Sequence, residues 1–275
     1  MGAVASETSA RLKLVEPAVT VSVVRPQRRV PAQLISFAVL VAVIAAWELA
    51  AIYGYINLFF LSAPSAIAMA GKEILLNGEL LTNLLVTAYA YLIGVISACV
   101  LGAVLGLAMG WWRRFGEIID PYVVFFSAMP RIALYPVFLM IFGIGDLSRI
   151  LIVFIGVLFP VIFNAYIGAK QTPKVLVDVG RVFGYSKTRM FFKIVLPASL
   201  PYLMAGFRIG VTLGMILVVV AEFLGSANGL GQKIAVTAQL YHTPEMYAWV
   251  FYTSLIALVV VWGTDRLERR VLQWT

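Results

Sequence analysis

The sequence predicts an all-α polytopic membrane protein with about six transmembrane helices. Three observations support this: 62% of its 275 residues are hydrophobic, only 12% are charged, and the mean hydropathy is +0.96. Soluble domains are closer to half apolar and a quarter charged. The apolar residues also gather in runs of about twenty, the length of a membrane-spanning helix, whereas barrel strands alternate in shorter segments.

The amino-terminal end divides into an arm and a first span. Residues 1–31 carry Ser, Thr, Pro and basic residues without an apolar core, which predicts a flexible cytoplasmic arm rather than a cleaved signal peptide. Residues 32–275 are then expected to form one transmembrane domain, which begins with a span at 32–53. The amphipathic stretch 55–80, interrupted by Pro and Gly, predicts a short helix at the outer surface.

Five further spans follow, at about residues 81–112, 121–142, 149–169, 202–223 and 247–263. The second span carries Gly102, Gly106 and Gly110, a spacing of small residues that lets two helices approach closely. The third is interrupted at Pro130 and Pro136, and prolines break helical hydrogen bonding where a span lines a cavity or simply kinks. We expect both chain termini in the cytoplasm, because most of the 21 basic residues then lie on that side and only Lys72, Arg149 and Lys233 lie outside.

Several classes of site and partner are not expected. Cys99 is the only cysteine and His242 the only histidine, so disulfides within the chain are excluded and zinc or haem sites are very poorly supported. The net charge of +8 comes from Lys and Arg placed between apolar runs, a pattern that orients a membrane protein and does not indicate nucleic-acid binding. No cofactor is expected in this chain.

The stretch 170–200 is the large cytoplasmic loop. Thr172 is a plausible helix N-cap, Gly184 a natural helix end, and Ser186 can cap a second short helix that ends at Pro197. The first helix has an apolar stripe, made of Val175, Leu176, Val179, Val182 and Phe183. Such a helix fits a groove on a partner protein and equally well a layer of lipid headgroups, and the residues leave both open.

This loop resembles the cytoplasmic "EAA" motif of bacterial ABC-importer permeases, which reads E-A-A, three residues, G, nine residues, I-x-L-P. Asp178, Val179 and Gly180 stand at the E-A-A positions and depart from that consensus. Gly184 is the motif glycine, and Ile194, Leu196 and Pro197 fall at the proper spacing. The segments LSAPSAI (61–67), SAMPRIALYPVFLMIFGIG (127–145) and AEFLGSANGLG (221–231) are similar to the sulfonate/taurine/nitrate branch.

The resemblance implies a type I importer transmembrane domain in the bacterial inner membrane, serving a small anion. It implies a second, identical permease copy, two ATPase subunits that hold ATP and magnesium, and a periplasmic or lipid-anchored binding protein. The chain itself carries no G-x-x-x-x-G-K-[ST] motif and is not expected to be an enzyme. The residues expected to couple to the ATPase are Asp178, Val179, Gly180, Val182, Phe183, Gly184, Ile194, Leu196 and Pro197.

The candidates for the translocation pathway are Pro130, Arg131, Pro136 and Glu222. Intramembrane charges usually pair, so we expect Arg131 to pair with a carboxylate, Glu48 or Glu222, ahead of contacting a ligand. Glu222 also begins a Gly-rich stretch that predicts a flexible outer loop. Two other functions stay open: an ion-coupled secondary transporter, which would need intramembrane acids in inverted repeats, and a non-transporting membrane scaffold.

Overall fold

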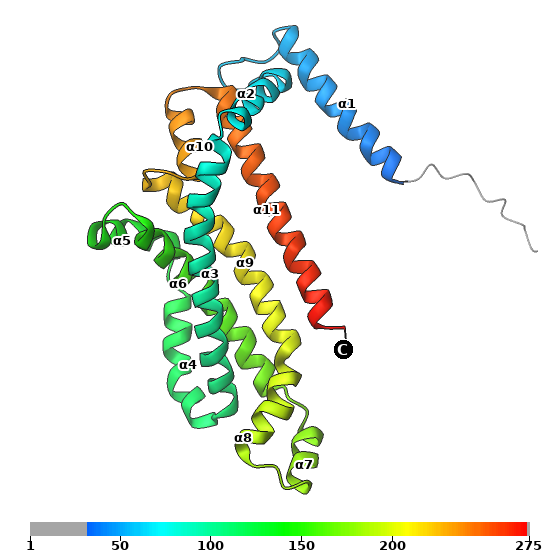
Figure 1. Ribbon diagram of the computed structural model, residues 1–275, viewed down its shortest axis with the longest axis vertical. Helices are drawn as coiled ribbons and strands as arrows, with labels where there is room; N and C mark the ends of the chain where they lie inside the picture. Colours follow the sequence, from blue (N-terminus) through cyan, green and yellow to red (C-terminus); the bar gives the residue numbers. More distant parts are fainter. Residues whose placement is uncertain (1–31, 274–275) are drawn as a thin grey trace, which may run out of the picture. The chain divides into compact units, whose positions relative to one another are not determined.

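The computed structural model describes residues 32–273, which over that range form helices joined by short connections (Figure 1). The predicted arm, 1–31, lies outside the described residues. The chain divides into two compact units, Met1–Ala46 and Trp47–Thr275. Helix α1 (Ala32–Ile52) begins in the first unit and ends in the second.

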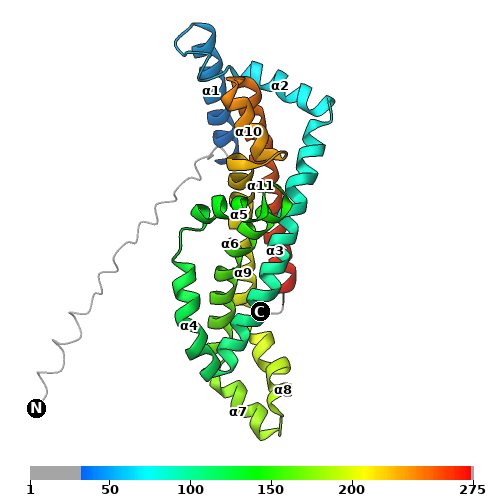
Figure 2. The same cartoon turned by 90° about the vertical axis from the view of Figure 1, so that its left-hand side faces the viewer.

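The second unit holds ten further α-helices and two short irregular ones, the 3₁₀-helix η1 and the π-helix η2. In chain order they are α2 (Pro64–Leu76), α3 (Glu79–Trp111), α4 (Arg113–Ser127), η1 (Arg131–Leu134), α5 (Tyr135–Phe142), α6 (Asp146–Lys170), α7 (Lys174–Val182), α8 (Lys187–Met190), η2 (Phe191–Val195), α9 (Leu196–Gly225), α10 (Leu230–Gln239) and α11 (Thr243–Val271). Helices α7 and α8 lie at one end of this unit, and α2 and α10 lie at the other (Figures 1 and 2).

The prediction of about six spans is confirmed. Five helical stretches are long and apolar enough to cross a membrane: α1, α3, α6, α11 and the run from Lys187 to Gly225. A sixth arises if α4 and the η1–α5 segment count as one broken span, with a bend of 82° between them. The predicted third span therefore starts earlier than expected, at Arg113, and its break lies at Pro130. Pro136 causes no kink, because it lies in the first turn of α5, where a proline removes no hydrogen bond.

Helices α3 and α6 pack closely along their whole length because glycines of α3 leave room for α6. A Cβ added at Gly94, Gly102, Gly106 or Gly110 would come within 3 Å of side chains of Val153, Val161, Ala165 and Ala169 respectively. The predicted role of the glycine stripe is thus confirmed. Residue numbers rise in step along both helices, so α3 and α6 run parallel, and the segment between them has to carry the chain back.

The core of the unit lies where α9 joins this pair. Val153 and Val157 of α6 and Val218 of α9 are fully buried, together with Ala90 and Ala98 of α3. Many large apolar side chains elsewhere on the long helices are exposed, as expected for surfaces that contact lipid or another protein. The three central spans are therefore held by close packing of small and β-branched residues.

The expected break at Pro197 is not present. Helix α8 continues through the π-helical turn η2 into α9, so that residues 187–225 form one helical run. Pro197 lies in the first turn of α9. The wider π turn directly before it is where the missing proline N–H can be accommodated without ending the helix.

Candidate functional site

Helix α7 ends in a well-defined turn. Gly184 has φ +67°, and the N–H of Tyr185 donates to the carbonyl of Gly180 at 2.9 Å while that of Gly184 donates to Arg181 at 3.0 Å. These two bonds form a Schellman motif, for which glycine is the favoured residue. The predicted helix end at Gly184 is confirmed. At the other end Pro173, and not Thr172, occupies the N-cap position.

The second helix of this hairpin begins as predicted. The backbone N–H of Arg189 donates to the hydroxyl of Ser186 at 3.3 Å, so Ser186 caps α8. The guanidinium of Arg189 lies over the ring of Tyr185 at 4.5 Å. We call residues 173–195, which comprise α7, the turn and α8–η2, the α7–α8 hairpin.

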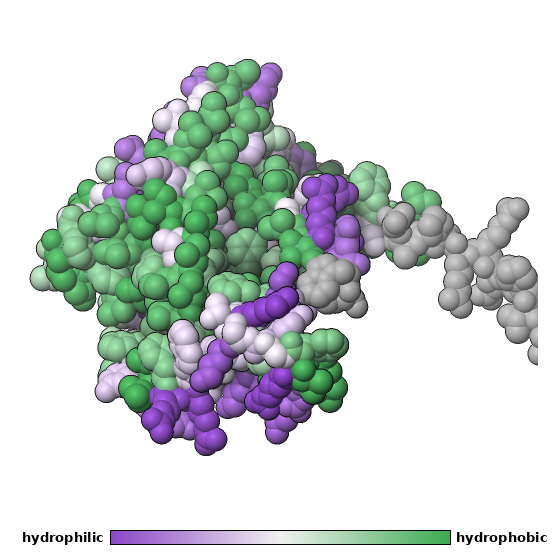
Figure 3. Space-filling view, turned by 60° about the horizontal axis from the view of Figure 1, so that its bottom comes forward, coloured by the Kyte–Doolittle hydropathy of each residue, from purple (hydrophilic) through white to green (hydrophobic). Residues whose placement is uncertain are grey.

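The apolar stripe of α7 is largely exposed. Val182 is 86% exposed and Phe183 74%, and the other members of the stripe, Val175, Leu176 and Val179, are also exposed. Next to them Arg181 pairs with Asp178 at 2.8 Å, in an exposed ion pair. Figure 3 shows hydrophilic residues gathered at this end of the molecule beside apolar ones. The hairpin thus presents an apolar surface with charged edges and no covering element among the described residues.

The inner side of the hairpin is closely packed. A Cβ at Gly180 would lie 2.7 Å from Cδ1 of Ile194, so only glycine lets α7 approach η2 this closely without a shift of that side chain. Val179, Phe183 and Pro197 line the same hollow as Gly180 and Ile194. Leu196 instead packs on the cluster around Leu107, Ala165 and Ala169. The structure therefore brings five of the predicted coupling residues together around one hollow.

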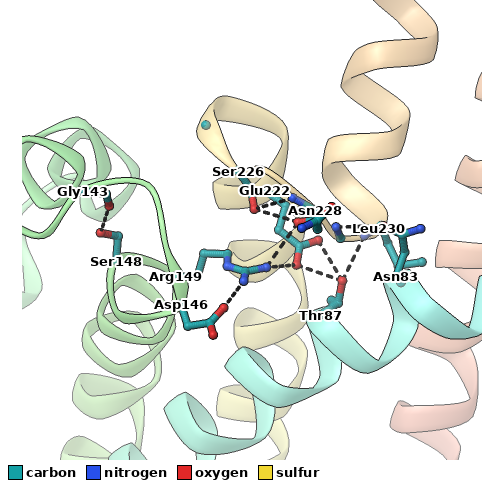
Figure 4. Close-up of polar contacts among 12 residues, drawn as sticks. Asn83, Thr87, Gly143, Asp146, Ser148, Arg149, Glu222, Ser226, Asn228 and Leu230 are labelled. Atoms are coloured by element: carbon teal, nitrogen blue, oxygen red, sulfur yellow. Dashed lines mark hydrogen bonds and ion pairs between the residues drawn. The ribbon is translucent and has the colours of Figure 1, made fainter.

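A second cluster is buried at the opposite end of the unit (Figure 4). Glu222 of α9 has a fully buried side chain and pairs with Arg149 of α6 at 3.1 Å, which is itself 5% exposed. The other amino group of Arg149 pairs with Asp146, and the hydroxyl of Thr87 donates to the Glu222 carboxylate at 2.9 Å. This cluster joins α3, α6 and α9 through charge-assisted hydrogen bonds.

The same cluster fixes the connection between α9 and α10. The backbone N–H of Gly231 donates to Glu222 at 3.0 Å, that of Leu230 to Thr87 at 3.0 Å, and that of Gly229 to the amide oxygen of Asn83 at 3.0 Å. Gly229 has φ +120°, and a Cβ there would lie 2.3 Å from the Glu222 carboxyl group. The predicted flexible Gly-rich loop is therefore a constrained turn built on Glu222.

The expected pairing of Arg131 is wrong. Its guanidinium donates to two backbone carbonyls, of Ser127 and Gly156, each at 3.4 Å, and it makes no ion pair with any carboxylate between residues 32 and 273. Glu222 is already occupied by Arg149, and Glu48 accepts hydrogen bonds from Ser65 at 2.7 and 3.0 Å.

Arg149 is the residue that sequence reasoning missed. Its place beside a predicted span end made it look like an exposed loop residue, yet it lies one turn inside α6. Arg208, the remaining intramembrane arginine, pairs with Asp265 at 3.0 Å and Glu268 at 3.3 Å of α11. The acids of the carboxyl-terminal segment, one turn apart, were the available sequence signal for that pairing.

Comparison with known proteins now gives the family. Residues 98–273 match the model of the binding-protein-dependent transport system inner membrane component family. The chain belongs to this family. It is thus a permease subunit of an ABC importer, and the predicted fold class and transport function are confirmed.

The permease is similar to the putative aliphatic sulfonates transport permease protein SsuC of Bacillus subtilis, with 29% identity and 84% of each chain covered. It is 26% identical to the taurine transport system permease protein TauC of Escherichia coli, over 87% of this chain and 89% of that one. An inward-facing structure of the MetNI methionine ABC transporter has the same fold. Its TM-score is 0.62 at 19% identity, over 71% of the permease and 97% of that chain.

Proposed function

We propose that this permease forms the translocation pathway of a bacterial inner-membrane importer for small anions of the sulfonate, taurine or nitrate kind. It works as a pair of identical copies. Two ATPase subunits, which bind ATP and magnesium, dock on the α7–α8 hairpins, and a periplasmic or lipid-anchored binding protein delivers the ligand. The substrate class rests on the similarity to permeases whose names specify aliphatic sulfonates and taurine.

The exposed apolar stripe of α7 is the observation that carries the proposed coupling. Val182 and Phe183 make the most exposed part of the stripe, and burial of such side chains favours binding by about 1.5–3 kcal/mol each. The hairpin belongs to the same helical unit as the central spans, and its glycine turn fixes the direction of the stripe. A helix of this kind fits a groove on a partner protein, as amphipathic helices commonly do.

The proposed mechanism uses the hairpin as a mechanical link. When ATP draws the two ATPases together, the two α7 helices follow them, and each pulls on α8 and α9 through the contact of Gly180 with Ile194. The spans then rock between inward- and outward-facing arrangements. Of the predicted coupling residues, Val182 and Phe183 contact the ATPase, Asp178 and Val179 border the contact, and Gly180, Gly184, Ile194, Leu196 and Pro197 hold the hairpin.

The test is copurification of the ATPase with the detergent-solubilised permease carrying Val182→Asp. A buried aspartate in the interface costs several kcal/mol, so we expect copurification to be lost while the permease elutes as wild type in size-exclusion chromatography. Val182→Leu is the matched control and should retain the ATPase. Retention of the ATPase by Val182→Asp would overturn the assignment of α7 as the docking helix.

A further inference from the structure

Among the arginines of the membrane-spanning helices, Arg131, Arg149 and Arg208 differ in their partners. Arg149 pairs with Glu222 and Asp146, and Arg208 pairs with Asp265 and Glu268. Arg131 has only two long hydrogen bonds to backbone carbonyls, each at 3.4 Å. Its positive charge is therefore not compensated by any carboxylate of the described part of the chain.

Arg131 lies deep in the membrane-spanning unit. Gly156, whose carbonyl it reaches, is ten residues from the start of α6 and fourteen from its end, which is roughly 15 Å and 21 Å along the helix. In Figure 2 the α5 segment that follows Arg131 lies between the α7–α8 end and the α2–α10 end of the unit. An unpaired guanidinium at this depth needs a special environment.

The backbone around Arg131 excludes contact with lipid. Residues 128–130 are not helical, and η1 begins at Arg131, at the 82° bend between α4 and α5. Irregular backbone at membrane depth occurs only where it is covered by protein or faces water, and unpaired intramembrane charges obey the same rule. Of these two settings we infer the water-filled one, because Arg131 is only half-buried and lines a hollow.

A hollow of about 360 Å³ lies beside Arg131, which is within the size range of small-ligand sites. Apart from Arg131 its walls are apolar, and they come from the break and from α9: Met129, Pro130, Ile132, Leu213, Ile216 and Leu217. The hollow contains one cationic group and no acidic one. Its chemistry suits a ligand with one anionic end and an apolar body.

We propose that Arg131 binds the anionic head of the transported ligand at the break in the α4–α5 span, while the neighbouring hollow holds an apolar body. The ligand class is then an organic monoanion such as an alkanesulfonate. This inference rests on the proposed function, because it takes the permease to be an anion importer. A planar guanidinium donates two parallel hydrogen bonds to an oxyanion, which a sulfonate accepts well.

The residues that line the hollow disfavour the two other proposed substrates, taurine and nitrate. The ammonium group of taurine would enter an apolar hollow beside a guanidinium, without a carboxylate to compensate it, which costs free energy. Nitrate has no apolar body, so contact with the six apolar residues of the hollow adds no binding free energy. All three anions suit the charge of Arg131, and the hollow thus selects the one with an apolar body.

The test uses the permease assembled with its ATPase in liposomes, with the binding protein outside. ATP-dependent uptake of 1-propanesulfonate, taurine and nitrate is measured for wild type, Arg131→Gln and Arg131→Lys. We expect wild type to import propanesulfonate best, and Arg131→Gln to lower its uptake about tenfold or more through loss of a charge-assisted hydrogen bond. Arg131→Lys retains part of the uptake. Copurification of the ATPase with each variant shows that the transporter is still assembled.

Arg270→Gln, the same substitution at an exposed site near the end of α11, is the control and should leave uptake unchanged. The inference is overturned if Arg131→Gln imports propanesulfonate at more than half the wild-type rate, or if wild type with its ATPase bound imports taurine or nitrate but not propanesulfonate. Uptake of none of the three with the ATPase bound also overturns it. Failure of the ATPase to copurify at all would instead refute the proposed function.

A second measurement tests access of water to Arg131 without relying on transport. Cys99→Ser removes the only cysteine, and Arg131→Cys in that background is treated with the anionic reagent 2-sulfonatoethyl methanethiosulfonate. Only a hydrated thiol ionises and reacts, so we expect labelling with or without ATP, and slower labelling with propanesulfonate present. Val100→Cys, at an exposed apolar position midway along the spanning helix α3, is expected to face lipid and is the unlabelled control. No labelling of Arg131→Cys in either nucleotide state would overturn the inference.

Discussion

At the scale of single residues, the ion pair of Arg149 and Glu222 keeps one end of the unit well ordered. Both side chains are buried, and the carboxylate accepts hydrogen bonds from three different elements: α3, α6 and the first turn of α10. A buried pair of this kind contributes less by mutual attraction than it costs when one member is removed. Its role is to hold the α9–α10 turn in a single conformation.

Removal of one member should therefore be worse than removal of both. We expect Glu222→Met to destabilise the purified permease by about 3–5 kcal/mol, because Arg149 is left buried without its main partner. Arg149→Met combined with Glu222→Met should recover much of that loss. Thermal unfolding in detergent, followed by size-exclusion chromatography of heated samples, compares these two variants and Arg149→Met alone with wild type. A double variant less stable than either single one would contradict this account.

Sequence reasoning identified two of the intramembrane charges, missed Arg149, and did not predict the ion pairs. Glu222 and Arg131 were both recognised, and pairing them was the simplest way to satisfy two charges. The partner of Glu222 was Arg149 because α6 begins at Asp146, one turn before the predicted start of the span. An error of one turn in a span boundary is enough to turn a buried arginine into an apparent loop residue.

At the scale of elements, the contact between α3 and α6 depends on the absence of side chains at four positions of α3. A Cβ at Gly106 would lie 2.4 Å from the carbonyl oxygen of Ile162, which is backbone and cannot rotate away. In a membrane, where lipid is as apolar as the helices, such close packing supplies much of the association free energy.

Gly106→Ala should accordingly destabilise the permease by about 1–3 kcal/mol, the usual cost of overpacking. Gly263→Ala is the matched control, since Gly263 also lies inside a long helix but has no atom within 4 Å of an added Cβ. We expect that control to be neutral or slightly stabilising because alanine has the higher helix propensity. Melting temperatures of Gly106→Ala and Gly263→Ala are compared in the same detergent. An equal fall in melting temperature for both variants would contradict the packing argument.

The helices themselves were largely predictable, because long apolar runs and glycine spacing determine them locally. The π turn at Phe191–Val195 was not, since the proline that seemed to end the helix marks a change in its winding. The order of the Gly-rich turn after α9 was also missed. It depends on Asn83 and Thr87, which are more than 130 residues away in sequence.

At the scale of the whole molecule, the parallel packing of α3 and α6 determines the number of crossings. Two parallel spans require a return between them, and the segment from Arg113 to Phe142, with its 82° bend, supplies it. The bent pair therefore counts as the third of six spans. With six spans both ends of the chain lie on the same side of the membrane, and the distribution of basic residues predicts that this is the cytoplasmic side.

Reporter fusions test this topology. Green fluorescent protein fused after Thr275 should be fluorescent, and alkaline phosphatase fused at the same point should be inactive, because the first folds in the cytoplasm and the second only outside it. Fusions within the connection after Gly225 should show the opposite pattern. Active phosphatase at the carboxyl terminus would imply an odd number of crossings.

The unbroken run from Lys187 to Gly225 gives the molecule a lever. Its 39 residues extend over roughly 58 Å, from the hairpin that we expect to meet the ATPase to the turn built on Glu222. The continuous helix passes a displacement of α8 on toward the far end, and the π turn at Phe191–Val195 and Pro201 are the points where the run can bend. The helix would pivot where α9 packs closely on α6. The lengths of helix on the two sides of that contact then determine how far each end of the translocation pathway opens.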